Sequence, residues 1–304
     1  MIFINPKTDF AFKKIFGSEE SKPILVSFLN ALLYQEQPVI IDLEILDPYQ
    51  APRISGIKDT YLDVKARLSD GKTVIIEMQV LNLEGFEKRI LYNAAKAFSI
   101  QLSVGQDYKL LNPVIALTIT DFEMFPDRSK VISRYVLKER EALTDYSDDI
   151  ELVFAELPKF TKPLSELETV AEKWLYFLKH ARELHDVPPN MQNIPALERA
   201  FNIANQAQLT PDELEAMERR EIFLHDSRNA ILKAANQARE KGWQEGLKEG
   251  LQEGLQQGEQ RMAIKIAQQL LGILDLETIS QKTGLSLEEL QTLQAQNSQA
   301  NRSG

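Results

Sequence analysis

The sequence contains no cysteine. This excludes disulfide bonds, thiolate zinc sites, iron–sulfur clusters and cysteine nucleophiles, and it is typical of proteins in a reducing compartment. Long apolar runs are also missing, since no stretch approaches the roughly 20 residues that span a bilayer. The N-terminus lacks the basic segment and apolar stretch of a secretory signal. We therefore expect a cytoplasmic protein that does not associate with membranes.

The sequence has fewer basic residues than acidic residues. The 304-residue chain has 35 lysine and arginine residues against 45 aspartate and glutamate residues, which gives a net charge of −10. This balance argues against a strongly basic nucleic-acid coat, although it leaves room for a local basic groove. Hydrophobic residues make up 43% of the sequence, enough to bury one large core or two ordinary ones.

Proline is missing from the last third of the chain, because all 13 prolines lie at or before Pro211. Since proline interrupts helices, this last third is predicted to be helical. We expect a mixed α/β domain over residues 1–125, a helical extension over 126–235 and a helical C-terminal segment over 236–304.

Residues 1–125 alternate between patterns typical of helices and patterns typical of strands. Thr8 can cap the first helix, and the nearly continuous apolar run over 113–120 is typical of a strand in the middle of a sheet. The predicted helices cover 9–16, 22–33 and 86–104, and the predicted strands cover 39–46, 61–68, 73–80 and 113–120.

The most informative segment, residues 61–80, is predicted to form a β-hairpin. Apolar and polar residues alternate on both sides of Asp70-Gly71, which is a turn sequence. A two-residue loop would mix apolar and charged residues on each face of the hairpin. A three-residue loop over 69–71, closed by Gly71 in the left-handed region, gathers the apolar residues on one face. Burial of that face selects the three-residue loop.

The three-residue loop sets two acids opposite each other. Val64 then faces Ile76 on the apolar side, and Asp63 faces Glu77 on the polar side. Cβ atoms of directly opposed strand residues lie about 4.5–5.5 Å apart, so the two carboxylates repel unless a cation or a proton lies between them. Magnesium prefers carboxylate oxygen and water as ligands. The pair therefore indicates a metal site.

The polar face of the hairpin allows two interpretations. Gln79 shares this face with the acids, and its amide could orient a water molecule on a metal ion. Lys65 and Arg67 share the face too, and in the simpler interpretation they neutralise acids on an ordinary solvent-facing side of a strand. Residue spacing alone does not decide between them.

Asp63 followed by Glu77-x-Gln79 on the next strand resembles the signature of PD-(D/E)xK nucleases. More narrowly, the chain is similar to the Rpn family of recombination-promoting nucleases, also described as transposases. The similar stretches are 5–16, 62–66 and 76–79, the helix with Arg89, Tyr92 and Ala95, Gln101 and Tyr108 before 113–115, and the glycine and glutamate repeats near the C-terminus. The resemblance implies a restriction-endonuclease-like mixed sheet flanked by helices and followed by a helical C-terminal half.

The resemblance also implies an activity, the hydrolysis of phosphodiester bonds in DNA by a magnesium- or manganese-dependent endonuclease in recombination, mobile elements or defence. Asp63 and Glu77 would hold the metal, which lowers the pKa of a bound water and shields phosphate charge. Gln79 replaces the lysine of the signature and supplies no positive charge. Asp9 belongs to the family's first motif and is a further candidate catalytic carboxylate, or else a charge that complements its helix dipole.

DNA binding requires cations in the first domain. The candidates for phosphate contact are Lys13, Lys14, Lys65, Arg67, Lys88 and Arg89. Their other interpretation is ordinary surface charge. Two rival functions stay open at this point: a catalytically inactive platform that binds DNA or protein, and a transposase that joins DNA strands.

The C-terminal segment has a glycine at every fourth position from Gly242 to Gly258. Each glycine costs about 1 kcal/mol relative to alanine in a helix. Leu247, Leu251 and Leu255 run beside the glycines, where a second helix could approach closely. We expect a homo-oligomer formed through these helices, and the alternative is a flexible linker.

Residues 263–294 resemble a small helix-turn-helix. Ser286 and Glu289 are spaced as a capping box. The second helix carries two glutamates and no basic residue, so we expect it to pack against other helices and not to read DNA.

Overall fold

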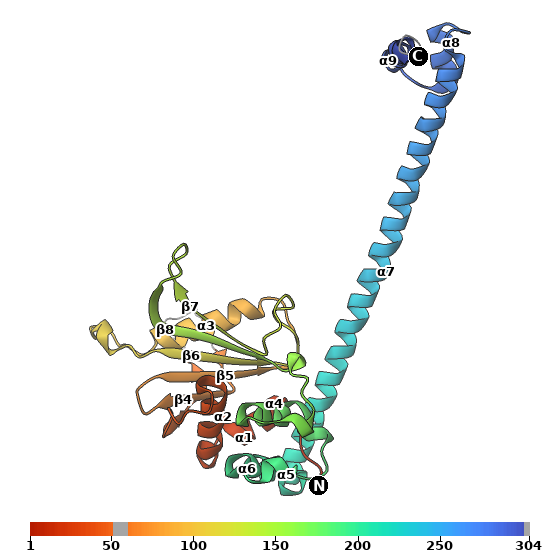
Figure 1. The fold of residues 1–304 in the computed structure, drawn as a ribbon. Coiled ribbons are helices and arrows are strands. Elements are labelled where there is room, and N and C mark those ends of the chain that lie inside the picture. The colour runs from red at the N-terminus through yellow and green to blue at the C-terminus, as the bar shows by residue number, and fades with distance from the viewer. Residues whose placement is uncertain (51–59, 301–304) are drawn as a thin grey trace. The chain divides into compact units, whose positions relative to one another are not determined.

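The computed structural model describes residues 1–50 and 60–300 (Figure 1). The chain divides into two compact units, Met1–Arg228 and Asn229–Gly304. Every strand that the structure describes lies in the first unit. Helix α7 (Pro211–Leu270) begins in the first unit and continues into the second.

The first unit is built on a six-stranded mixed sheet with the strand order β1-β4-β5-β6-β8-β7 (Figure 1). Its strands are β1 (Leu43–Leu46), β4 (Val64–Leu68), β5 (Thr73–Gln79), β6 (Val114–Thr120), β7 (Ile132–Lys138) and β8 (Asp145–Glu156). The three central strands β5, β6 and β8 are parallel, and the outer pairs are antiparallel. Two short strands, β2 (Tyr49–Gln50) and β3 (Thr60–Tyr61), form a separate ribbon.

Strand β6 lies between two parallel neighbours, and all seven of its residues are buried. A strand covered on both faces needs an almost continuous apolar sequence, which the chain provides here. The prediction of a central strand over 113–120 is therefore confirmed.

The predicted hairpin register is also confirmed. Val64 pairs with Ile76, and Ala66 pairs with Val74. The N–H of Gly71 donates to the carbonyl of Leu68 at 2.9 Å, and Gly71 has a φ of +90°. These contacts define the expected three-residue loop closed by a left-handed glycine.

Helices cover both faces of the sheet. On one face pack α1 (Asp9–Phe16), α2 (Lys22–Tyr34), α4 (Val170–His180) and α6 (Pro195–Ala204), which share a core with the apolar side of the hairpin. On the other face α3 (Phe86–Ser99) buries Ile75 against Ala94 and Ala97. The remaining short elements of the first unit are α5 (Pro189–Gln192) and the 3₁₀ helices η1 (Glu19–Ser21), η2 (Tyr108–Leu110), η3 (Leu157–Lys159), η4 (Leu164–Glu166), η5 (Ala181–Glu183) and η6 (Gln206–Gln208).

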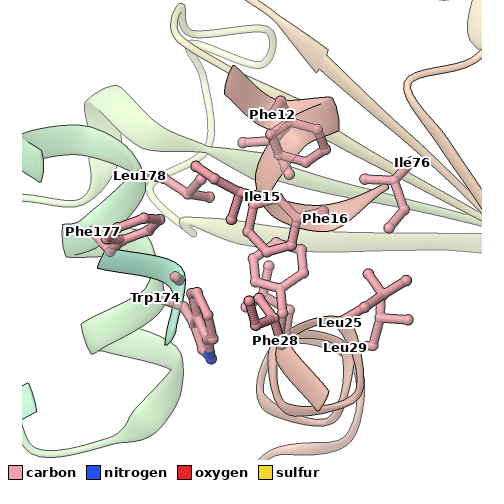
Figure 2. Packing of buried hydrophobic residues seen from close by; sticks show 14 of the residues in the cluster. Phe12, Ile15, Phe16, Leu25, Phe28, Leu29, Ile76, Trp174, Phe177 and Leu178 are labelled. Carbon is pink, nitrogen blue, oxygen red and sulfur yellow. The ribbon is translucent and has the colours of Figure 1, made fainter. Parts of the chain in front are cut away.

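Aromatic side chains hold α1 in place (Figure 2). Phe16 of α1 contacts Phe28 of α2 with ring centroids 4.8 Å apart, and Phe28 contacts Trp174 of α4 at 5.6 Å. Phe12 and Phe16 have no exposed surface. Burial of each such ring stabilises the fold by roughly 1.5–3 kcal/mol. These contacts fix the position of α1 and of its polar residues Asp9 and Lys13.

The observed architecture confirms the predicted fold class, a mixed sheet flanked by helices and followed by a helical C-terminal half. The prediction that 126–235 is helical is wrong for β7 and β8. The first half of β8 is rich in aspartate and exposed, and only its last four residues are fully buried. This first half pairs with β7, and the second half of β8, from Ile150 on, pairs with β6.

The second unit is helical, as expected. It contains the rest of α7, α8 (Leu276–Thr283) and α9 (Leu287–Ala300). Ala267, Ile279, Leu285 and Leu290 form a small core that joins the end of α7 to the two short helices. The capping box is confirmed, since Ser286 N donates to Glu289 and Glu289 N donates to Ser286 Oγ. None of the described helices is long and apolar enough to cross a bilayer.

Candidate active site

Asp63 lies at the point where β4 begins. The main-chain N–H of Met78 donates a hydrogen bond of 2.7 Å to Oδ2 of Asp63. In a continuing ladder this N–H would bond to a main-chain carbonyl of the neighbouring strand. The side chain of Asp63 replaces that partner, and its carboxylate therefore sits beside the peptide that follows Glu77.

Helix α1 brings a second acid and a cation to Asp63. Lys13 Nζ lies 2.8 Å from Asp9 Oδ1 and 3.7 Å from Asp63 Oδ1. Thr8 caps the helix, because its hydroxyl accepts a hydrogen bond from Ala11 N. The sequence predicted both Asp9 and Lys13 as functional residues, and the structure places them together at Asp63.

The two aspartates have different proton affinities. Burial and a hydrogen bond with Asp9 raise the pKa of Asp63 to about 7. Burial also raises the pKa of Asp9, but its hydrogen bonds with Asp63 and Lys13 outweigh this and leave its pKa below the ordinary value. The pair therefore takes up a proton close to neutrality when no metal ion is bound.

Glu77 belongs to β5 and lies under α3. It is buried, and Asn93 Nδ2 donates a hydrogen bond to its Oε1. Arg89 Nη2 lies 3.7 Å from its Oε2. Burial raises the pKa of Glu77, against the opposing effects of Asn93 and Arg89. Asn93 was not predicted as a site residue, although an asparagine on the apolar face of the helix over 86–104 is a signal that could have found it.

The side-chain amide of Gln79 is hydrogen-bonded to two other residues. Its Oε1 accepts a hydrogen bond of 2.7 Å from Arg89 Nη2, and its Nε2 donates to the carbonyl of Leu81 at 2.8 Å. Both ends of the amide are thus engaged within the protein. Gln79 orients Arg89, and the expectation that its amide orients a water molecule has no support in this arrangement.

The six predicted DNA-contacting cations have different partners and surroundings. Lys13 and Arg89 lie beside the acids, as described above. Lys88 and Arg89 line a cavity of about 660 Å³ at the N-terminus of α3.

The other three cations lie elsewhere. Lys14 pairs with Glu213, and Arg67 pairs with Glu44 at 3.3 Å. Lys65 is half-buried, and burial lowers its pKa. Lys14 and Arg67 are thus paired with acids other than Asp63 and Glu77.

The donor set fits a hard divalent cation. Asp63 just before β4 and Glu77 of β5 both offer carboxylate oxygens, and burial raises the pKa of both groups. Asn93 Oδ1 is buried beside Glu77 without a hydrogen-bond partner. Within residues 1–50 and 60–300, no group of three or more His, Cys, Asp or Glu side chains is arranged for a metal. Two carboxylates with water or phosphate completing the shell are typical of magnesium.

Residues 6–234 match the family described as PD-(D/E)XK nuclease family transposase. The match contains the entire six-stranded sheet and both helices, α1 and α3, that contribute to the site. No curated protein and no solved structure matches the chain.

Proposed function

Because the chain belongs to the PD-(D/E)XK nuclease family of transposases, we propose that it is a divalent-metal-dependent endonuclease that hydrolyses phosphodiester bonds in DNA. The observation that best supports this proposal is the hydrogen bond from Met78 N to Asp63, which holds one partly buried acid beside the peptide that follows the other acid. Recombination, mobile elements and defence are the proposed biological settings, and the absence of cysteine keeps the cytoplasm as the proposed compartment.

In this proposal Asp63 and Glu77 hold magnesium or manganese. A cation bound there would activate water at neutral pH and shield the charge on phosphate oxygens. Met78 N orients Asp63, and Asn93 orients Glu77. Arg89 is kept beside the acids by Gln79, where its guanidinium can contact a DNA phosphate.

A plasmid assay tests the proposal. Supercoiled DNA is incubated with the protein and magnesium, with manganese, and with EDTA, and nicked and linear products are measured. We expect cleavage that requires the metal and falls at least about 100-fold in Asp63→Asn and Glu77→Gln. Asp148→Asn is the matched control, because this acid is exposed on β8. Cleavage that is equal in all four proteins would rule out the assigned site.

The rival proposal is a platform that binds DNA without cleaving it. The replacement of the signature lysine by Gln79 favours it, because position 79 carries no positive charge. DNA binding measured in calcium, together with complete absence of cleavage in magnesium and manganese, would support this alternative. A strand-transfer assay with defined DNA ends tests the third possibility, a transposase that joins strands.

We also propose that the protein self-associates through α7. Leu247, Leu251 and Leu255 are 58%, 66% and 61% exposed, and a Cβ added at Gly246 or Gly250 would meet nothing within 4 Å apart from the neighbouring backbone of its own helix. A second copy of the helix would cover these leucines at short distance. Sedimentation analysis of the triple leucine-to-glutamine variant tests this, and a mass equal to that of the unmodified protein would contradict it.

A further inference from the structure

Cleavage of a phosphodiester requires positive charge beside the reacting phosphate, because negative charge builds up on its oxygens. Position 79 does not provide it, since Gln79 is neutral and its amide is engaged with Arg89 and Leu81. We propose that Lys13 of α1 is a catalytic residue that contacts the reacting phosphate or the attacking water beside Asp63. This inference rests on the proposed nuclease function and names the residue that replaces the missing lysine.

The position of Lys13 carries the proposal. Its ammonium group is within 3.7 Å of Asp63 and forms an ion pair with Asp9 at 2.8 Å. An ammonium group has three donors, so an ion pair with Asp9 leaves donors for a phosphate oxygen or a water molecule. About two-fifths of the Lys13 side chain is exposed, which makes it accessible to a substrate. Asp9 then acts as a positioning residue for Lys13.

Helix α1, which carries Lys13, is anchored by buried aromatic residues. Phe12 on one side of Lys13 is fully buried, and Phe16 is fixed by Phe28 and Trp174 (Figure 2). A cation on such a platform is held near Asp63 before substrate binds, so little ordering is required in the transition state.

Neighbouring cations are less suited to this role. Lys14, the next residue, pairs with Glu213. Arg89 lies on the side of Glu77, is bound by Gln79, and stacks over Phe86 at 4.9 Å from the ring centroid. Of the cations that the structure describes, Lys13 is the one paired with Asp63.

The test compares Lys13→Met, Lys13→Arg and Lys14→Met. Lys14→Met is the matched control, because it removes the same charge from the adjacent position. Single-turnover cleavage is measured at saturating DNA, DNA affinity is measured in calcium, and manganese affinity is measured by titration without DNA. Thermal unfolding verifies that each variant is folded.

We expect Lys13→Met to slow cleavage about 100-fold and to change DNA affinity less than about threefold. Manganese affinity should stay the same or increase, because a cation beside the acids is removed. Lys14→Met should cleave within about threefold of the unmodified protein. Lys13→Arg should keep more activity than Lys13→Met, since it preserves the charge.

Two results would overturn the role of Lys13 while leaving the nuclease proposal intact. One is cleavage by Lys13→Met at the rate of Lys14→Met. The other is a loss of cleavage matched by an equal loss of manganese affinity, which would mean that Lys13 only organises the acids. Normal cleavage by Asp63→Asn and Glu77→Gln would instead contradict the proposed function itself.

Discussion

The side chain of Asp63 accepts a hydrogen bond from the main chain of Met78 at 2.7 Å. Asp63 directly precedes β4 and Met78 lies in β5, and the contact forms where the regular ladder between these two strands stops. An acid that completes a sheet ladder is held more firmly than an acid on a free loop, because the bonded peptide is fixed by its own strand. This hydrogen bond lowers the pKa of Asp63, but the opposing effect of burial is larger.

The substitution Asp63→Asn should stabilise the metal-free protein, and the gain in unfolding free energy should be larger at high pH. The pKa of Asp63 is raised from 3.8 to about 7 in the folded state, so its ionised form is disfavoured there. The protonated carboxyl group of Asp63 therefore contributes stability that is fully present below the unfolded pKa of 3.8. This contribution is lost as the pH rises through the folded pKa of about 7.

The expected difference is measured by urea unfolding of Asp63→Asn and the unmodified protein in EDTA. The gain in unfolding free energy should be larger at pH 8 than at pH 5 by about 1–3 kcal/mol. Asp148→Asn, which removes the charge of an exposed acid on β8, is the control. A gain that is larger at pH 5 would contradict the assigned proton affinity.

Asn93 should position Glu77 for metal binding. Asn93→Ala removes the hydrogen bond to Glu77 Oε1 from α3. Loss of a residue that orients a metal ligand costs about 10–100-fold in metal affinity or activity. Manganese titration and plasmid cleavage measure this effect, with the exposed Glu87→Ala on the same helix as control. Equal manganese affinity in both variants would exclude the positioning role.

Gly71 should be needed for the hairpin loop for two separable reasons. Alanine is strained at its φ of +90°, and an added Cβ would lie 2.7 Å from Asn112 Oδ1. Gly85 has a φ of +79°, but a Cβ there meets nothing within 4 Å. Backbone strain of about 1–2 kcal/mol is expected for alanine at both positions. We expect Gly71→Ala to cost about 1 kcal/mol more than Gly85→Ala, because only Gly71→Ala also creates the close contact with Asn112.

The steric part is tested with Gly71→Ala combined with Asn112→Ala. In urea unfolding, Asn112→Ala should cost less in the Gly71→Ala background than in the unmodified protein, because it also removes the close contact. Strictly additive costs would show that the approach to Asn112 contributes nothing.

Removal of Lys159 should destabilise the first unit strongly. Glu156 at the end of β8 is fully buried, and its carboxylate binds Lys159 Nζ at 2.7 Å and accepts hydrogen bonds from Met124 N and Phe125 N. Lys159→Met leaves this acid without its counterion, which costs about 3–5 kcal/mol in similar buried pairs.

Chemical unfolding of Lys159→Met and Lys162→Met provides the measurement. Lys162 forms an ion pair with Glu172 at the surface, so its replacement should change the unfolding free energy little. A similar small change in Lys159→Met would contradict the stabilising role of the buried pair.

Local patterns were enough to predict several parts of the fold. The alternation around 69–71 determined the hairpin register, because a shift of one residue would expose the whole apolar face. The continuous apolar run of β6 predicted a central strand, and the long proline-free segment predicted α7. Asp63 and Glu77 followed from the register as candidate site residues.

Other features depended on contacts between distant parts of the chain. The first half of β8 is acidic and exposed and forms a strand by pairing with β7, so its own sequence pattern is weak. The site contacts of Asn93 and Lys13 come from α3 and α1, which pack on opposite faces of the sheet. Residue periodicity shows which face of a helix is buried, but it does not show which strand that face will meet. The sequence by itself thus determined the register of the hairpin from Val64 and Ile76 to its loop, and only tertiary packing decided which helices bring Lys13 to Asp63 and Asn93 to Glu77.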